Sequence, residues 1–301
     1  MAKFTISVDS SSDLYKSFLK ANNIYCLVMK RVLNGKEIEE LFDSEREFDN
    51  FYETLKKGDL PTTVAINPFE LKEHFEKILK AEKDGDIIHV GLSSGLSLTQ
   101  ENALKAAAEV NETLKGRKVY AFDSLVATHG IVQLVDELIK LRDAGVATED
   151  AIKRITELRD HQQGWVIMTD LFHLKRGGRI SGAKAVIGAI LGIKPIVCIN
   201  DKGKLAIENK MRGNSGAINY ILGKIKELGE NARDDFKDGT IYAVRTSKSA
   251  LFDELKSAVS EKYPTMKVKE AVIGPIIGTH LGCGGAIVLF EGAKRLSVKG
   301  G

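Results

Sequence analysis

The chain has 301 residues, of which 43% are hydrophobic and 28% are charged. This composition suits a globular protein that is long enough for two domains. The formal net charge is +3, and 7% of the residues are aromatic. These values argue against nucleic-acid binding, which requires a strongly basic surface or aromatic side chains that stack on bases.

The sequence has no signal-peptide pattern and no apolar run long enough to cross a bilayer. The three cysteines, Cys26, Cys198 and Cys283, are widely spaced and fit a reducing cytoplasm better than a disulfide framework or a zinc site. No two histidines have the spacing of metal ligands. We therefore expect a cytoplasmic protein without a metal or cofactor, and transient contact with a membrane surface stays open.

In the first half of the chain, short apolar runs alternate with amphipathic runs. Strands are expected at residues 5–8, 24–29, 87–90 and 119–122. Helices are expected around 48–55, after Asn67-Pro68, and at 99–114, 125–141 and 148–161. Strands that alternate with helices indicate a parallel sheet covered by helices on both faces.

The second half has a different pattern. Its expected strands at 195–199 and 205–210 are joined by the turn Asp201-Lys202-Gly203, which predicts an antiparallel hairpin. Further strands are expected at 165–168, 240–244, 267–273 and 286–290, and helices at 214–228 and 249–263. We therefore expect an α/β protein with two domains. These are a parallel-sheet α/β domain at 1–163 and an α+β domain with a mostly antiparallel sheet at 164–301.

Three expected strands of the first domain are followed by polar side chains. The segments are Asp9-Ser10-Ser11-Ser12-Asp13, Gly91-Leu92-Ser93-Ser94-Gly95 and Asp123-Ser124. The carboxyl ends of parallel strands meet at one edge of a sheet, where ligands bind, so we expect one shared crevice. Helices that begin there add backbone N–H groups, and the crevice is expected to prefer an anion. The alternative is that each Ser or Asp only caps its own helix.

Two further segments carry groups that suit an anion. Thr62 and Thr63 add hydroxyl groups just before the helix that opens at Asn67. The segment 174–182 places Lys175, Arg176 and Arg179 around two adjacent glycines. Such a flexible basic loop meets a carboxylate or a phosphate well. The plain alternatives are an ordinary turn and a solvated basic turn.

The glycine-rich segment 274–285 holds Thr279 and His280, which are candidates for contact with a ligand head group. The alternative is a tight structural loop. A competing function comes from Gly91-Leu92-Ser93-Ser94-Gly95, because this run matches the G-x-S-x-G pattern of hydrolases. The chain order Ser93, Asp123, His280 also matches a catalytic triad. No His-Gly-Gly-Gly segment precedes Ser93, and the hydroxyl-rich ends recur at other strands, so serine hydrolysis is the alternative function.

Together these motifs resemble the DegV family. The likeness is carried by Asp9–Leu14, Pro61–Thr63, Ser93–Ser97, Asp123-Ser124, Leu174–Ser181, Lys194-Pro195 and Gly274–His280, in the family's order over nearly the whole chain. The resemblance implies a two-domain fold that holds a long-chain fatty acid between its domains without catalysing a reaction. It also implies a partner, because FakB-like members present the fatty acid to a separate fatty acid kinase that forms acyl-phosphate.

The resemblance also implies roles for single residues. The carboxylate contacts would be Thr62, Thr63, Ser93, Ser94, Thr279 and His280, while Arg176 and Arg179 would face the head group or the partner. Candidates for the wall around the acyl chain are residues 185–191 and Ile276-Ile277. The sequence departs from the family's usual pattern after Thr63, after Ser97 and at Cys283, which leaves the preferred chain length and saturation open.

Overall fold

The computed structural model describes residues 4–180 and 192–295. The chain forms two compact units, Met1–Ser44 with Pro61–Arg159, and Glu45–Leu60 with Asp160–Gly301. The expected limits differ from these units in two ways. The main boundary lies at Arg159 rather than at residue 163. The segment Glu45–Leu60 belongs to the second unit, although the sequence analysis assigned it to the first.

The first unit is built on a four-stranded sheet in which all strands run parallel. The order is β2-β1-β6-β7. The strands are β1 (Phe4–Asp9), β2 (Ile24–Leu27), β6 (Asp86–Gly91) and β7 (Val119–Asp123). The central strands are buried on both faces, since Ile6, Val8, Ile87, Ile88 and Val90 have no exposed surface. Burial on both faces explains the continuous apolar runs in the sequence, and the expected parallel sheet is confirmed.

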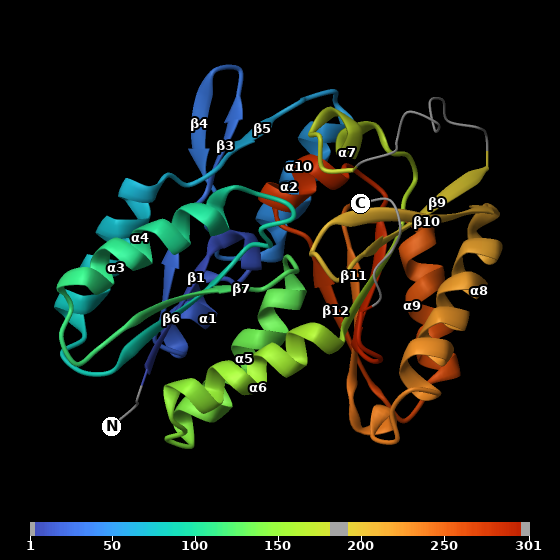
Figure 1. The fold of residues 1–301 in the computed structure, drawn as a ribbon. Helices are drawn as coiled ribbons and strands as arrows, with labels where there is room; N and C mark the ends of the chain where they lie inside the picture. The colour runs from blue at the N-terminus through green and yellow to red at the C-terminus, as the bar shows by residue number, and fades with distance from the viewer. Residues whose placement is uncertain (1–3, 181–191, 296–301) are drawn as a thin grey trace. The chain divides into compact units, whose positions relative to one another are not determined.

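Helices cover both faces of this sheet. They are α1 (Lys16–Ala21), α3 (Pro68–Ala81), α4 (Thr99–Thr113), α5 (His129–Asp143) and α6 (Thr148–His161), with the short turn η1 (Ser10–Ser12). Figure 1 shows α3 and α4 on one face and α5 on the other. The start of α3 follows from local chemistry, because the Asn67 side chain accepts the Glu70 N–H at 3.0 Å and the Glu70 side chain accepts the Asn67 N–H at 3.2 Å. Pro68 then occupies the first turn, as its fixed φ favours.

A second, small antiparallel sheet in the first unit was not anticipated. Its order is β4-β3-β5, with β3 (Lys30–Leu33), β4 (Lys36–Glu39) and β5 (Thr62–Val64). Asn34 and Gly35 join β3 to β4 with φ values of 51° and 76°. These values are typical of the two-residue hairpin turn that Asn-Gly favours. The strands are short, and β3 and β4 are rich in charged residues, so they lack the apolar runs by which strands are recognised.

The second unit contains a six-stranded sheet of order β10-β9-β8-β13-β11-β12. The strands are β8 (Gln162–Ile167), β9 (Ile193–Ile199), β10 (Leu205–Arg212), β11 (Thr240–Arg245), β12 (Lys267–Val272) and β13 (Ala286–Glu291). Neighbours pair antiparallel except β11 and β12, which run parallel. The expected hairpin is confirmed by the pairing of Ile199 with Leu205. The expected mostly antiparallel sheet is confirmed as well.

The remaining helices belong to the second unit. They are α2 (Glu45–Lys56), α7 (Phe172–Arg176), α8 (Gly213–Ile225), α9 (Ala250–Lys262) and α10 (Pro275–Leu281), with the turns η3 (Lys226–Glu230) and η4 (Phe236–Asp238). Helices α8 and α9 pack on the sheet in one apolar cluster that includes Ile221, Phe252 and Val288. A separate cluster joins Leu174 of α7 and Leu281 of α10 to the same sheet.

Helix α2 belongs to the second unit, which buries its apolar residues and forms ion pairs with its acidic residues. Its apolar residues Phe48, Phe51, Tyr52 and Leu55 are buried, with Leu55 the most exposed at 6%. The Tyr52 hydroxyl donates to the Ile273 carbonyl at 2.9 Å. Periodicity predicts a helix here, but it carries no information about which sheet the helix covers.

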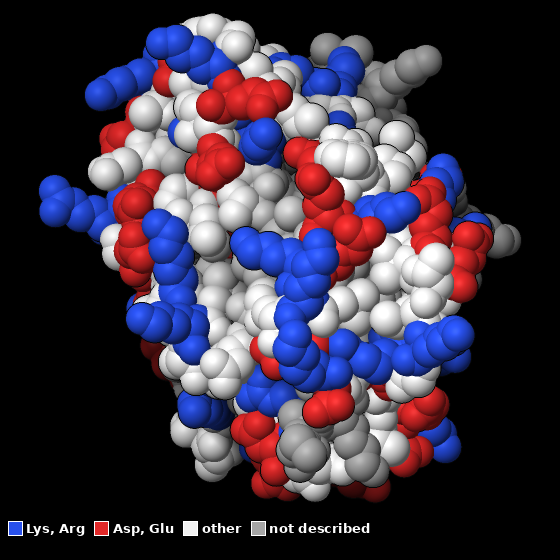
Figure 2. Space-filling model, turned by 90° about the vertical axis from the view of Figure 1, so that its left-hand side faces the viewer, with Lys and Arg blue, Asp and Glu red and all other residues white. Residues whose placement is uncertain are grey.

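The face that carries α3 and α4 bears charges of both signs. Figure 2 shows Lys and Arg side chains interspersed with Asp and Glu there. Two ion pairs illustrate the pattern, Lys105 with Glu101 at 2.9 Å and Lys72 with Glu109 at 3.1 Å. Among the described residues, no helix combines the length and apolarity that a membrane span needs.

Candidate functional site

The three polar strand ends of the first unit are tied together by hydrogen bonds. The Leu92 N–H donates to Asp9 Oδ2 at 2.8 Å, which joins the ends of β6 and β1. The Ser93 N–H donates to the Val126 carbonyl at 3.0 Å, which joins β6 to the loop after β7. The Thr128 N–H donates to the Ser11 carbonyl at 3.0 Å and closes the ring. The loops that the sequence analysis expected at one edge of the sheet therefore lie together there.

Asp9 organises this edge from inside the unit. Its side chain has no exposed surface and accepts hydrogen bonds from the Ser11 N–H, the Ser11 hydroxyl and the Leu92 N–H. Burial raises the pKa of the Asp9 carboxyl, although these hydrogen bonds favour its charged form. Since these hydrogen bonds tie the loop after β1 to the loop after β6, we assign Asp9 a structural role in holding the loops.

Ser93 and Ser94, which the sequence analysis treated as a pair, have different environments. Ser93 is fully buried, and its hydroxyl accepts the Gly95 N–H at 3.1 Å, so it stabilises its own turn. Ser94 is exposed, and its backbone N–H is fixed by Asp123 Oδ1 at 3.1 Å. Of the two, Ser94 has the hydroxyl that a ligand can reach.

The hydrolase pattern lacks the geometry of a nucleophile elbow. In such an elbow the serine sits on a strained turn with an exposed hydroxyl. Ser93 is buried and is not among the non-glycine residues with positive φ in the described ranges. Asp123, the expected orienting acid, uses Oδ1 to accept N–H groups from Ser94 and Leu125. His280, the expected base, belongs to the second unit.

The loop after β7, at the same edge of the parallel sheet, contains two residues with strained backbone conformations. Leu125 and Thr128 have φ values of 51° and 52°, a region that is unfavourable for side chains with a Cβ and most of all for a β-branched residue. Ser124 holds the loop, since its hydroxyl donates to the Val126 carbonyl at 3.1 Å. Strained residues persist only where the surroundings fix them, and they concentrate at functional sites. The sequence around Leu125 and Thr128 does not predict their strained conformations.

Thr62 and Thr63 lie on the small sheet of the first unit. They pair with Val32 and Arg31 of β3, and Thr62 is exposed while Thr63 is half-buried. Behind them, Arg31 forms an ion pair with Glu40, whose side chain is almost fully buried. Burial outweighs this pairing and raises the pKa of Glu40 to about 7.

The basic segment of the second unit is an ordered helix end and not a free loop. Helix α7 ends at Arg176 with Gly177 as its C-cap, and Gly178 has a φ of 70°. The Gly178 N–H donates to the Lys175 carbonyl at 3.0 Å and the Arg179 N–H to the Leu174 carbonyl at 3.0 Å. These are the two bonds of a Schellman motif, which needs glycine at the left-handed position. The expected flexible loop is therefore corrected. Residues 181–191, which include the first expected acyl-chain wall, lie outside the described residues.

Glycines allow α7 and α10 to approach closely. A Cβ on Gly177 would lie 2.2 Å from His280 Nδ1, and a Cβ on Gly282 would lie 2.4 Å from His173 Cδ2. The glycine at the end of each helix therefore packs against the histidine of the other helix. The glycines and His280 stand out in the sequence, whereas His173 has no sequence signal and is revealed only by the paired packing.

His280 is buried and lies within the electrostatic influence of two arginines. Burial, together with the charges of Arg179 and Arg176, lowers the pKa of His280 to about 4, so the ring is neutral near pH 7. Beside it in the chain, Thr279 is 1% exposed and its hydroxyl has no partner within the described structure. Buried hydroxyls are rarely left unpaired, so Thr279 Oγ1 is a candidate for contact with a ligand atom.

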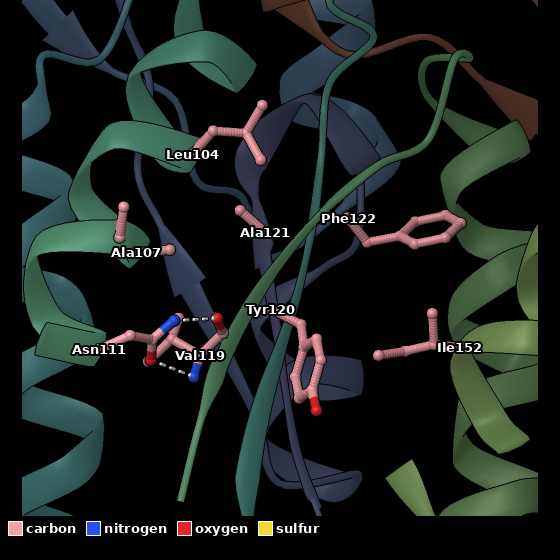
Figure 3. Close-up of a pocket in the computed structure, with 9 residues that line it drawn as sticks. Leu104, Ala107, Asn111, Val119, Tyr120, Ala121, Phe122 and Ile152 are labelled. Atoms are coloured by element: carbon pink, nitrogen blue, oxygen red, sulfur yellow. Dashed lines mark hydrogen bonds between the residues drawn. The ribbon is translucent and has the colours of Figure 1, made fainter. Parts of the chain in front are cut away.

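One cavity of the first unit lies beside its parallel sheet. A groove of about 320 Å³ runs along β7 between α4 and α6. Figure 3 shows Leu104, Tyr120 and Ile152 around it, and Asn111 hydrogen-bonded to both backbone groups of Val119. None of the expected ligand-binding residues lines this groove. Among the described residues, no group of His, Cys, Asp and Glu side chains has a metal-binding arrangement.

The fold places the chain among α/β proteins that combine a parallel-sheet unit with a mostly antiparallel one. The chain belongs to the DegV family, whose sequences are described as uncharacterised, with residues 3–291 matched. A DegV domain-containing protein of Caldanaerobacter subterraneus subsp. tengcongensis is 30% identical, and the match covers 97% of this chain and 99% of that protein. One of Clostridium perfringens is also 30% identical, over 98% of this chain and 99% of that protein.

Solved structures share the whole fold. DegV of Bacillus subtilis, described as a fatty acid binding protein, is 26% identical with a TM-score of 0.80, covering 97% of this chain and 100% of that chain. A DegV family protein from Eubacterium eligens, loaded with heptadecanoic acid, is 20% identical with a TM-score of 0.76, over 97% of this chain and 100% of that chain. The expected family and fold class are confirmed.

Proposed function

We propose that this protein binds a long-chain fatty acid and does not catalyse a reaction on it. The buried, unpartnered hydroxyl of Thr279, next to the neutral ring of His280, carries this proposal. Such a place suits an anionic oxygen. The likeness to the fatty acid binding protein DegV of Bacillus subtilis supports the choice of a carboxylate with an acyl chain.

In this proposal, the carboxylate is bound by hydroxyl groups of both units. Ser94 and Thr63 contribute from the first unit, assisted by Thr62, while Thr279 and His280 contribute from the second. Ser93 acts indirectly, because its hydroxyl is engaged with the Gly95 N–H. Hydrogen bonds to a charged group contribute about 1.5–3 kcal/mol each. Neutral donors suit a ligand that must be released.

The acyl chain supplies most of the affinity. Each CH₂ group that is buried contributes about 0.8 kcal/mol, so a long chain exceeds the head-group contacts before association costs are subtracted. Ile276 is 3% exposed, and Ile277 packs against the apolar cluster that holds Leu174 and Leu281. We propose these two isoleucines as part of the wall around the chain.

Fatty-acid binding is tested by extracting the purified protein with organic solvent and analysing the extract by mass spectrometry. Binding of a defined fatty acid is then measured by calorimetry. Ser94→Ala is expected to weaken binding by about tenfold or more, the value of one hydrogen bond to a carboxylate. Ser257→Ala, on the exposed face of α9, is the matched control. A protein that contains no fatty acid after purification and takes up none on addition would contradict the proposal.

We further propose that the bound fatty acid is presented to a separate kinase, with Arg176 and Arg179 facing the head group or that partner. Replacing both by Ala is expected to lower ATP-dependent acyl-phosphate formation while fatty-acid binding is retained, because these cations stabilise charge outside the hydroxyl contacts. Lys202→Ala with Lys204→Ala removes the same charge from an exposed turn and serves as the control. Unchanged turnover in the arginine variant would refute this role.

A further inference from the structure

Arg245, at the end of β11, is a charged residue buried in the second unit. Its side chain is 2% exposed and forms ion pairs with Asp49, at 2.8 Å, and with Glu45. Glu270 lies at 3.9 Å. A buried guanidinium without partners is strongly destabilising, so these carboxylates are required for its burial. Glu45 and Asp49 are four residues apart on α2 and therefore lie on the same side of that helix.

The contacts of Arg245 form a closed circuit with α2. Its side chain holds Asp49 of α2, and its backbone carbonyl accepts the Ile273 N–H at 2.8 Å. The carbonyl of Ile273 in turn accepts the hydroxyl of Tyr52, which is also on α2, at 2.9 Å. Ile273 is followed by Gly274, the N-cap residue of α10. The circuit thus fixes α2 at the point where the chain enters α10.

Helix α2 also packs tightly on α10 itself. A Cβ on Gly278 would lie 2.6 Å from the Tyr52 hydroxyl and 2.8 Å from Phe51 Cε1. Gly278 directly precedes Thr279 and His280, the two groups that we propose for the carboxylate. Since α10 has only seven residues, a shift at Gly278 is transmitted to both side chains.

We propose that Arg245 is a positioning residue for the ligand-binding side of α10 and acts through α2. The proposal rests on the function proposed above, because it assigns a purpose to the placement of Thr279 and His280. Arg245 itself does not touch the ligand. The arrangement explains why a helix from the first part of the chain is built into the second unit.

The test compares carboxylate selectivity among variants. The ratio of affinities for a fatty acid and for the fatty alcohol of the same length reports head-group placement, whereas a loss of general stability or of chain binding changes both affinities alike. Asp49→Asn with Glu45→Gln loosens α2 by removing the partners of Arg245. Gly278→Ala displaces α2 directly and does not remove the ion pairs, so it remains informative if the first variant fails to fold.

Both variants are expected to lower the selectivity ratio by about tenfold, as expected for the loss of one hydrogen bond to a carboxylate. Gly223→Ala is the matched control, because it is also a glycine in a helix of this unit and a Cβ there meets no atom within 4 Å. Folded variants that keep the wild-type selectivity would overturn the proposal.

A second readout separates this inference from the proposed function. In the histidine-ring NMR spectrum of the ligand-free protein, the His280 signal, assigned with His280→Gln, is expected to move in both variants and to stay in place in Gly223→Ala. If the wild-type protein shows no carboxylate preference, the proposed function fails while the His280 signal still decides the positioning. An unmoved signal in Gly278→Ala refutes it.

Discussion

Replacing Gly177 by Ala tests the packing that creates the His280 site. The added Cβ would lie 2.2 Å from Nδ1 and 3.0 Å from Cε1 of His280. Non-bonded carbon atoms settle at about 3.5–4 Å, so the ring must move by roughly 1 Å or more. Overpacking of this kind costs about 1–3 kcal/mol. The backbone of Gly177, with φ −75° and ψ −10°, accepts Ala without strain, so any cost comes from the contact.

The expected result is a fall in the free energy of unfolding of about 1–3 kcal/mol, measured by urea denaturation. Fatty-acid affinity is expected to fall by about tenfold or more as the His280 contact is lost. The added replacement His280→Ala removes the clash. Gly177→Ala should then cost little in that background, which a double-mutant cycle measures.

Gly178→Ala provides the contrast. A Cβ there meets no atom within 4 Å, but φ is 70°, so the variant loses about 1–2 kcal/mol through backbone strain alone. That loss should be the same with or without His280. If Gly177→Ala also costs the same in both backgrounds, the packing of His280 on Gly177 is not the cause and the reasoning is refuted.

Three further predictions concern the first unit. Burial lowers the pKa of His74 to about 4 and of His89 to about 3, so unfolding takes up protons and the free energy of unfolding falls as the pH drops from about 6.5 towards 4. His74→Gln should reduce this pH dependence, which urea denaturation at pH 7 and pH 5 measures. An unchanged difference between the two pH values would contradict the assignment. Asn111→Ala should lower the free energy of unfolding by about 1–3 kcal/mol, because both backbone groups of Val119 lose their partner, with exposed Asn231→Ala as the neutral control. Asp9→Asn should lower the melting temperature, because an amide turns one acceptor towards the Ser11 and Leu92 N–H groups into a donor; an unaltered melting curve would remove Asp9 from its organising role.

The sequence pattern was sufficient for the parallel sheet and the antiparallel hairpin because those signals are local. The runs ending at Val8, Val90 and Phe122 are short and mainly apolar, as is typical of strands in a covered sheet. The turn at Asp201-Lys202-Gly203 fixes its own hairpin. The polar segments after the strands were found for the same reason, since topology brings the carboxyl ends of parallel strands together.

The sequence pattern did not predict which distant parts of the chain pack against each other. Helix α2 has a clear apolar face, but its destination depends on Arg245, which lies 196 residues from Asp49. The different exposure of Ser93 and Ser94 was not predictable either. The two serines are adjacent in one turn, and the conformation of that turn decides which hydroxyl is buried. The order of the basic segment at Arg176 and Arg179 follows from a helix cap, whose glycines were first interpreted as flexibility.

Because residues 45–60 belong to the second unit, they are synthesised well before the residues on which they pack. With chain growth of roughly 5–20 residues per second, the 196 residues between Asp49 and Arg245 imply a delay of about 10–40 s before α2 can meet its ionic partner. During that interval Phe48, Phe51, Tyr52 and Leu55 lack their final neighbours. The apolar face of residues 45–56 therefore stays uncovered by the second unit until that unit has been made. A fragment that starts at Asp160 would never receive this helix, and its Arg245 would have to remain solvated.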